Sequence, residues 1–351
     1  MSKRPKRWRR ILLFVTVLPA SILAILASLA PHLSVDTFPE IQFLAIGFPF
    51  TLPLWIFWVW RGMRLRARWS MVLSLLVLLS CGRVVLRDWQ LDGGDSAHES
   101  TLSVLSFNVG TFNFDPENIF LVAELLDSLK PDVVVMQEFR NQRMEDGKNA
   151  MEYLESRCGF EHNQFVHLPY HVHGAAIFSH HQITGLDTLF LPVEEINSGI
   201  LFRLETDLGP VAVANVHLTS FHMAGTMAGR GGIRHKFQTI HQRIREALRL
   251  QQVKVDAIVS GVHGLDIPVI VAGDFNAAPH SRIIEQLRRR LSDSFSEAGS
   301  GNGWTYQLGS IAGIRIDYQF ASPNLQPLSH EVVRVPISDH YPTFVTYQTI
   351  P

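Results

Sequence analysis

The first quarter of the chain consists of long apolar runs separated by short polar or basic segments. Two runs without charge cover 11–30 and 41–60, and a third apolar run covers 70–86 with Arg83 inside it. A helix of 20 residues spans ~30 Å, the thickness of the hydrocarbon core of a bilayer. The pattern therefore predicts three transmembrane helices, at about 11–30, 41–60 and 70–86, in a membrane anchor over residues 1–87. A cleaved signal peptide is the alternative for the first run, and the two later runs disfavour it.

Basic residues flank these runs unevenly. Residues 2–10 carry six Lys/Arg and residues 61–68 carry four arginines, whereas residues 31–40 carry none and include two acids. Because Lys and Arg are retained on the cytoplasmic side, both basic segments are expected inside. Three crossings then place the rest of the chain outside the cytoplasm, and a third run that only lies in the interface would reverse this. The prediction is a multi-pass protein of the cell membrane with an extracytoplasmic catalytic domain.

The chain after the anchor changes to short strand patterns mixed with helical periodicity. Residues 88–100 are polar and glycine-rich, as expected of a linker, and a second domain is predicted over 101–351. Strand patterns are found at 102–108, 132–137, 173–179, 201–205, 211–217 and 269–274, with two further strand-like segments at 313–318 and 338–342. Helical spacing covers 115–129, about 233–260 and 281–291. The mixture predicts an α/β domain.

The charge of the second domain bears on its partners, and the number of cysteines bears on disulfide bonds. The whole chain sums to −1, but residues 101–351 hold 19 Lys/Arg against 26 Asp/Glu, a net −7. A net-acidic domain binds polyanions poorly, so nucleic acid is a possible partner but not the favoured one. Two cysteines, Cys81 and Cys158, make a disulfide framework very unlikely. The oligomeric state is not readable from the sequence.

Polar residues recur where the predicted strands end. The run Val-Ile-Val-Ala-Gly-Asp over 269–274 is followed by Phe275-Asn276, and period two puts Asp274 and Asn276 on the same side of the strand. Other strand patterns end at or deliver Asn108, Glu138 and His217, while the two strand-like segments carry Asp317, Asp339 and His340. The pattern predicts one site built at strand ends.

In chain order these motifs are Ser-Phe-Asn, Gln-Glu, Asn-Val-His-Leu, Gly-Asp-Phe-Asn, Arg-Ile-Asp-Tyr and Ser-Asp-His. The series resembles the endonuclease/exonuclease/phosphatase superfamily, the deoxyribonuclease I-like proteins, over roughly residues 100–348. More narrowly, the chain resembles bacterial members with three N-terminal transmembrane helices. The resemblance implies an α/β (α+β) fold in four layers, with two mixed β-sheets packed as a sandwich and flanked by helices.

The resemblance also implies roles for single residues. Three would bind Mg²⁺ or Mn²⁺: Asn108, Glu138 and Asp339. Asp274 would orient or deprotonate the attacking water, and Asn276 and His217 would donate to phosphate oxygens. Asp317 and His340 would form a hydrogen-bonded pair. Which residue is the general base stays open, and Gly110, where some relatives have an acid, leaves a second metal in doubt.

Two further expectations concern the surroundings of the site. Relatives that carry a tyrosine before the strand at 173–179 use it on the phosphate, and here Tyr170, His171 or His173 could serve. Arg249 and Gln252, three apart on the predicted helix 233–260, are expected to support the site from behind.

The leading hypothesis is a membrane-anchored, metal-dependent phosphoester hydrolase, a phosphodiesterase that acts on small or lipid-linked phosphoesters by in-line attack of water. One alternative is an endo- or exonuclease acting on DNA or RNA. The other is a catalytically inactive, membrane-tethered binding protein, which the complete set of site residues disfavours.

Overall fold

The computed structural model describes residues 4–87, 89–90, 100–115, 117–144, 147–168, 172–191, 197–221, 233–308 and 312–350. The chain divides into two compact units. Unit 1 comprises Met1–Arg87, Phe221–Arg249 and Ala278–Glu285, and unit 2 comprises Asp88–Ser220, Leu250–Ala277 and Gln286–Pro351. Two segments that follow the predicted linker therefore belong to the unit that contains the N-terminal helices.

Unit 1 is helical. Its N-terminal elements are α1 (Arg4–Ser28), η1 (Ala30–His32), α2 (Pro39–Gly47), η2 (Phe48–Thr51), α3 (Leu52–Leu65) and α4 (Arg68–Arg87). Two stretches are long and apolar enough to cross a membrane, Arg7–Ser28 and Pro39–Leu65. The prediction of three transmembrane helices is not confirmed, because the described apolar part of α4 covers only Arg68–Ser80. The arginines at 83 and 87 follow this stretch, so its uncharged part is shorter than a bilayer core.

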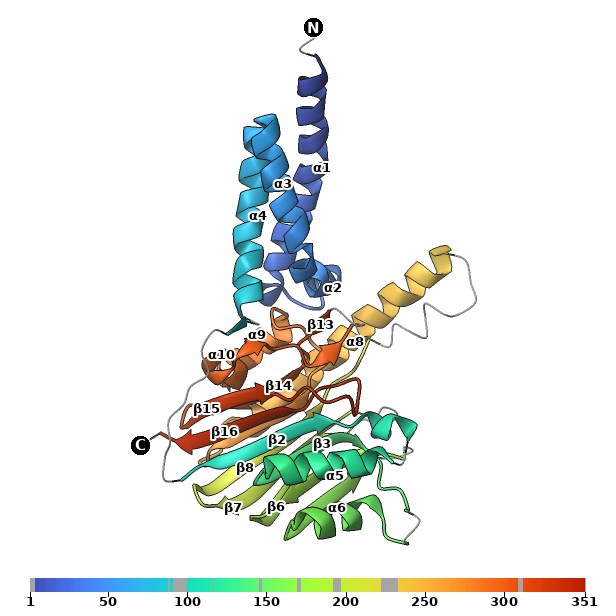
Figure 1. Cartoon of the computed structure of the whole chain (residues 1–351), viewed down its shortest axis with the longest axis vertical. Coiled ribbons are helices and arrows are strands. Elements are labelled where there is room, and N and C mark those ends of the chain that lie inside the picture. The colour runs from blue at the N-terminus through green and yellow to red at the C-terminus, as the bar shows by residue number, and fades with distance from the viewer. Residues whose placement is uncertain are drawn as a thin grey trace. The chain divides into compact units, whose positions relative to one another are not determined.

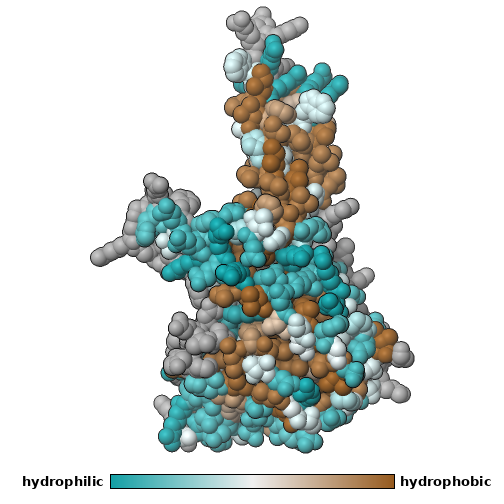
Figure 2. Space-filling model, turned by 180° about the vertical axis from the view of Figure 1, so that it is seen from behind, coloured by the Kyte–Doolittle hydropathy of each residue, from teal (hydrophilic) through white to brown (hydrophobic). Residues whose placement is uncertain are grey.

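Apolar side chains cover the outside of these helices. Among the described residues, 23 of the 30 exposed large hydrophobic side chains lie between residues 8 and 79. Figure 2 shows this hydrophobic surface on the face that it draws. Soluble proteins seldom leave a contiguous apolar surface of this kind in water, which marks a surface made for lipid or for another protein.

Unit 2 contains two six-stranded sheets (Figure 1). The first sheet has the order β15-β16-β2-β3-β5-β4, with β15 (Leu325–Val332), β16 (Thr343–Thr349), β2 (Leu102–Asn108), β3 (Val133–Phe139), β5 (Gly174–Ser179) and β4 (His162–His167). The second has the order β10-β14-β9-β8-β7-β6, with β10 (Ser292–Asp293), β14 (Asp317–Ala321), β9 (Val269–Asp274), β8 (Gly209–His217), β7 (Ser198–Thr206) and β6 (Gln182–Phe190). Each sheet mixes parallel and antiparallel pairs.

Apolar residues of both sheets form one core between them. Val104, Val133 and Ile177 of the first sheet and Val213 and Ile270 of the second are fully buried in it. Helices α5 (Asn118–Leu129) and α6 (Ala150–Cys158) cover the outer face of the first sheet, as Figure 1 shows. The predicted two-sheet sandwich flanked by helices is confirmed.

The remaining described elements are short, except for one helix. They are η3 (Gly110–Phe114), α9 (Arg282–Arg288), α10 (Ser294–Ala298), β1 (Trp89–Gln90), β11 (Gly301–Asn302), β12 (Tyr306–Gln307) and β13 (Gly313–Ile314). Helix α8 (Ile233–Val262) is 30 residues long and agrees with the predicted helix to within two residues. It belongs to unit 1 up to Arg249 and to unit 2 from Leu250.

Two strand expectations are wrong in detail. The segment 313–318 is not one strand, because β13 ends at Ile314 and β14 begins at Asp317. The segment 338–342 is a turn that leads into β16, with one isolated bridge between His340 and Tyr306. Period-two alternation cannot distinguish a short strand from a turn whose side chains are held by tertiary contacts.

Candidate active site

Three functional candidates lie side by side where three neighbouring strands of the second sheet, β8, β9 and β14, end or begin. In the parallel pair β8–β9, His217 is in register with Asp274, and in the antiparallel pair β9–β14, Asp274 is opposite Asp317. Because β14 runs against β9, its first residue lies where β9 ends. Asp317 therefore joins the same edge from the start of a strand, whereas the sequence pattern suggested a strand end.

Gly273 is required one residue before Asp274. Its φ is +146°, a value that L-residues rarely adopt, and an added Cβ would lie 1.9 Å from the carbonyl oxygen of Val216. The close approach of β8 and β9 leaves no room for a side chain. The glycine of the Gly-Asp-Phe-Asn motif thus lets the two strands that carry His217 and Asp274 pack tightly.

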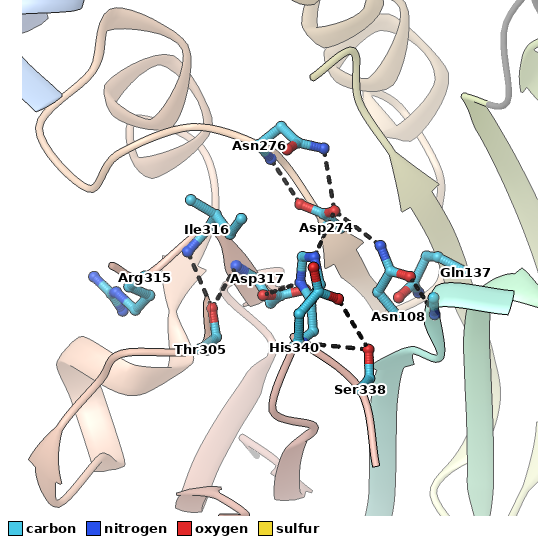
Figure 3. A network of polar contacts seen from close by, with 12 residues as sticks. Asn108, Gln137, Asp274, Asn276, Thr305, Arg315, Ile316, Asp317, Ser338 and His340 are labelled. Atoms are coloured by element: carbon cyan, nitrogen blue, oxygen red, sulfur yellow. Dashed lines mark hydrogen bonds and ion pairs between the residues drawn. The ribbon is translucent and has the colours of Figure 1, made fainter. Parts of the chain in front are cut away.

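The Asp274 carboxylate is buried and held by three hydrogen bonds (Figure 3). Its Oδ1 accepts from the backbone N–H of Asn276 at 2.8 Å. Its Oδ2 accepts from Nδ2 of Asn108 at 3.0 Å and from Nδ2 of Asn276 at 3.1 Å. Two imidazoles also face Oδ2, with Nε2 of His217 at 3.6 Å and Nε2 of His340 at 3.8 Å. Asp274 is the centre of the polar cluster.

Asn276 orients Asp274 from a strained position. Its φ is +48°, in the left-handed region that non-glycine residues seldom occupy. Besides its bond to Asp274, Nδ2 donates to the carbonyl oxygen of Leu218 at 3.0 Å. Both amide hydrogens are therefore donated within the protein, so the arrangement favours a role in orienting Asp274 over donation to a phosphate.

The first sheet supplies Asn108 and Glu138 to the same cluster. A bulge interrupts the pairing of β3 with β5 between Met136 and Phe139, and Glu138 within it has φ +52°. Bulges of this kind redirect a side chain next to a functional site. Oε1 of Glu138 lies 3.3 Å from Nδ2 of Asn108 and 3.7 Å from Nε2 of His217, so contacts from both sheets meet here.

Asp317 and His340 form a buried pair, as expected from the resemblance. Nδ1 of His340 lies 3.0 and 3.1 Å from the two carboxylate oxygens of Asp317. Thr305, which the sequence motifs did not identify, holds both partners in place. Its hydroxyl accepts from the backbone N–H of Asp317 at 3.0 Å and of Ile316 at 3.1 Å, and its carbonyl accepts from the N–H of Tyr341 at 2.6 Å.

The pKa values of two residues in the cluster, Asp274 and His340, are both raised, for different reasons. Burial raises the pKa of Asp274 to about 7, although the charge of His340 opposes this. Burial alone would lower the pKa of His340, but the carboxylates of Asp317 and Asp274 raise it to about 10. At neutral pH the cluster thus combines a protonated imidazole with a carboxylate close to its titration midpoint.

Two sets of residues offer oxygen or nitrogen ligands for a metal. Among the described residues, Asp274, Asp317 and His340 have ligand atoms within 4.8 Å of one another. In this group, Nδ1 of His340 is already engaged by the Asp317 carboxylate, and Nε2 faces Asp274. Glu138 fits better, because its carboxylate is 23% exposed and its oxygens are the ligands that Mg²⁺ and Mn²⁺ prefer.

The other two predicted metal ligands differ in their availability. The carbonyl oxygen of the Asn108 side chain accepts from the N–H of Gly110 at 3.0 Å, and one of its lone pairs stays open to a cation. Asp339 is exposed and accepts from the Ser338 hydroxyl at 3.3 Å. Burial and the hydrogen-bonded Asp339 carboxylate raise the pKa of Tyr306, whose ring centroid is 4.9 Å from that of His340.

Helix α8 supports the site through a neighbour of the predicted residue. Gln251 is buried, and its Nε2 donates to the carbonyl oxygens of Thr219 at 2.7 Å and Asn276 at 3.1 Å. Gln252 instead contacts Asp256 and Gln286, and Arg249 is exposed. The expectation that Arg249 and Gln252 support the site is therefore wrong, because a shift of one position along a helix changes the face on which a side chain lies.

A buried ion pair fixes the segment before Asp317. The Arg315 guanidinium makes two parallel 3.0 Å contacts with the Asp293 carboxylate, and lies over the rings of Phe295 and Tyr318. Burial alone would raise the pKa of Asp293, but Arg315 and Arg288 hold it well below its usual range. The arginine of the Arg-Ile-Asp-Tyr motif is therefore a structural support.

The residues expected before β5 are placed only in part. His173 is half-buried and directly precedes Gly174, which pairs with Phe139, the neighbour of Glu138. Tyr170 and His171 lie outside the described residues. A role for Tyr170 or His173 on the substrate stays a prediction.

The arrangement resembles that of known proteins. Residues 105–340 match the model of the Endonuclease/Exonuclease/phosphatase family. The structure of an endonuclease/exonuclease/phosphatase from Beutenbergia cavernae DSM 12333 is 21% identical, with a TM-score of 0.50, 71% of this chain covered and 72% of that chain. One from Bacteroides vulgatus is 14% identical, with a TM-score of 0.54 and coverage of 72% and 100%.

The human Nocturnin catalytic domain with bound sulfate is 19% identical, with a TM-score of 0.52 and coverage of 71% and 95%. At these identities the solved structures show the fold alone. No curated protein matches the chain. The family match spans more than half of the chain and includes Asn108, Glu138, His217, Asp274, Asp317 and His340. The chain belongs to the Endonuclease/Exonuclease/phosphatase family.

Proposed function

We propose that this protein is a membrane-anchored, metal-dependent phosphoester hydrolase that acts on small or lipid-linked phosphoesters. Family membership supports hydrolysis of a phosphoester. The observation that carries the proposal is the cluster around Asp274, in which a carboxylate, two imidazoles and two amides from both sheets converge. The two apolar helical stretches and their exposed hydrophobic surface support the anchor.

Asp274 is the residue best placed to take a proton from the attacking water. A general base works best when its pKa lies near the working pH, and burial brings that of Asp274 to about 7. Asn108 and Asn276 fix its orientation by hydrogen bonds to both carboxylate oxygens. The carboxylate therefore meets the water in one geometry and loses little entropy in doing so.

His340 and His217 are the donors for the negative charge of the phosphate. The Asp317 carboxylate keeps His340 charged, so its Nε2–H can stabilise a developing oxyanion. His217 lies within 4 Å of both Glu138 and Asp274 and can hold a second phosphate oxygen. A preorganised donor of this kind contributes a factor of about 10² to 10³ in kcat.

Glu138 is the proposed principal metal ligand, with Asn108 and Asp339 beside it. A divalent cation bound there would neutralise phosphate charge and lower the pKa of a bound water. The oxygen-only ligand set favours Mg²⁺ or Mn²⁺ over zinc.

The substrate class follows from charge and location. Duplex nucleic acid calls for a basic track, and residues 101–351 sum to −7, with 19 Lys/Arg against 26 Asp/Glu. An enzyme anchored in a bilayer meets lipid headgroups and small phosphoesters first. We therefore place these ahead of DNA or RNA, and the catalytic unit outside the cytoplasm.

The test is an activity panel on the full chain in nanodiscs with Mg²⁺ or Mn²⁺. The panel contains a phospholipid, sphingomyelin, a small phosphodiester, a phosphomonoester, plasmid DNA and RNA. The expected result is the highest kcat/KM on a lipid or small ester, abolished in Asp274→Asn. Higher kcat/KM on plasmid or RNA would establish the nuclease alternative, and no turnover of any substrate by a folded, metal-loaded protein would favour the inactive binding protein.

A further inference from the structure

The first half of α8 packs on the connection between the two candidate membrane spans and on the start of the second span. Ile240, Ile244 and Leu248, one helical turn apart, form an apolar cluster with Val35, Phe43 and Phe221. Phe43 and Phe221 meet edge to face with ring centroids 6.4 Å apart. Next to the cluster, Nε2 of His241 lies 2.6 Å from Oε1 of Glu40. All these residues belong to unit 1.

The location of this contact follows from the chain. The first candidate span ends at Ser28 and the second begins at Pro39, so the residues between them leave and re-enter the bilayer at one surface. A helix whose apolar stripe packs on this connection lies at the depth of the headgroups. Its other faces are then presented to that layer.

Those faces are basic. The half-helix 233–249 contains five Lys/Arg and one acid, Glu246, whereas the remainder of residues 101–351 has 14 Lys/Arg and 25 Asp/Glu. Arg243, Arg245 and Arg249 are exposed. A helix with one apolar stripe and basic residues on its other faces is typical of binding to an anionic membrane surface. Positive charge is thus concentrated on a half-helix that packs beside the candidate membrane spans.

We infer that the first half of α8 binds the headgroups of anionic phospholipids. The inference rests on the membrane anchoring in the proposed function, but it concerns a second site, distinct from the cluster around Asp274. Charge complementarity selects an anionic headgroup, and the packing on residues 29–43 places the arginines where such headgroups lie. The anchored protein would thus collect acidic lipid around itself.

The experiment measures lipid selectivity of the full chain in vesicles. Electron spin resonance gives the fraction of spin-labelled phosphatidylglycerol that the protein immobilises, relative to spin-labelled phosphatidylcholine. The wild type is expected to prefer phosphatidylglycerol by about five-fold or more at low salt, and less as salt is added. The variant Arg243→Gln/Arg245→Gln/Arg249→Gln should bring the ratio close to one, since glutamine keeps the helix propensity.

A matched control removes three arginines elsewhere, in Arg157→Gln/Arg203→Gln/Arg289→Gln, which changes the net charge equally. It should keep the wild-type selectivity. Retained selectivity in the α8 variant, or equal loss in the control, would overturn the inference, and so would displacement of phosphatidylglycerol by an oligonucleotide at equal phosphate concentration. Release of the wild type from vesicles by alkaline carbonate would instead refute the membrane anchor itself.

Discussion

Nδ1 of His340 lies 3.0 Å from Oδ2 of Asp317, while the opposite ring nitrogen faces Asp274. The Asp317 carboxylate accepts a hydrogen bond from Nδ1, which fixes the orientation of the imidazole ring and favours its charged form. Both carboxylate oxygens of Asp317 lie within hydrogen-bonding distance of Nδ1 of His340. In this geometry Asp317 acts through His340.

The contact between Asp317 and His340 predicts which of two substitutions lowers kcat more. His340→Gln should lower kcat by about 10² or more, because the charged donor is lost. Asp317→Asn should lower kcat less, by about 10-fold, because an amide can still orient the ring but no longer raises its pKa. Steady-state kinetics of the folded variants decides, and a larger loss in Asp317→Asn would show a direct chemical role for Asp317.

The pH profile should show both shifted groups. Asp274 acts deprotonated, so kcat/KM should fall as the pH falls through about 7. His340 acts protonated, so activity should fall as the pH rises through about 10. In Asp317→Asn the alkaline limb should move to lower pH, and an unmoved limb would mean that another group titrates there.

Removal of the metal should abolish turnover. Excess chelator is expected to reduce activity to background, with recovery on addition of Mg²⁺ or Mn²⁺. Glu138→Gln should weaken Mn²⁺ binding in calorimetry and lower kcat by about 10² or more, because a neutral amide replaces the principal ligand. Glu152→Gln, on the exposed first turn of α6, is the control. Full activity in chelator would refute the metal-dependent mechanism.

Gly273 offers a test of the strand packing below the site. Gly273→Ala should destabilise the fold by more than ~3 kcal/mol or prevent folding, because the new Cβ meets the Val216 carbonyl. Gly209→Ala is matched: its φ is also positive, at +88°, but nothing lies within 4 Å of the added Cβ. It should cost only about 1 kcal/mol of backbone strain. Equal losses in denaturant unfolding would show that the close approach is relieved by a shift of the strands.

Gln251 and Gln252 are adjacent and differ in what they contact. Gln251→Ala should lower kcat by about 10-fold with little change in KM, because it frees the backbone carbonyl of Asn276 and so loosens the orientation of Asp274. Gln252→Ala should leave kcat within two-fold, since its contacts are Asp256 and Gln286. Equal kcat and KM values in the two variants would show that Gln251 does not position the site.

Sequence patterns were sufficient wherever function coincides with a local motif. A β-branched run that ends in Gly-Asp-Phe-Asn predicted Asp274 and Asn276 as site candidates, and the family resemblance that rests on the motifs implied the two-sheet sandwich, which the structure confirms. The sequence patterns did not predict strands β15 and β16. They also did not predict the order of the strands, because register depends on partners far along the chain.

Residues that act through tertiary contacts were missed for a physical reason. Thr305 reaches Asp317 across a turn, and Gln251 reaches Asn276 from a helix. Nothing in the local sequence of either residue distinguishes it from a surface Thr or Gln. The crossing of the third apolar run stays a prediction, because Arg83 and Arg87 leave an uncharged part shorter than a bilayer core.

In the first sheet of unit 2, a strand from late in the chain lies beside the strand that comes first in the chain order of that sheet. Strand β16 lies between β15 and β2, and Thr343 pairs with Ser106, 237 positions earlier. During synthesis β2 therefore stays without this neighbour until residues 343–349 have emerged, and its backbone groups are open to wrong partners in the meantime. Pairing over such a distance is slow, because a long loop must close before any contact forms. Without residues 343–349, β2 and β15 would lack the strand that lies between them, and this sheet could not complete its pairing.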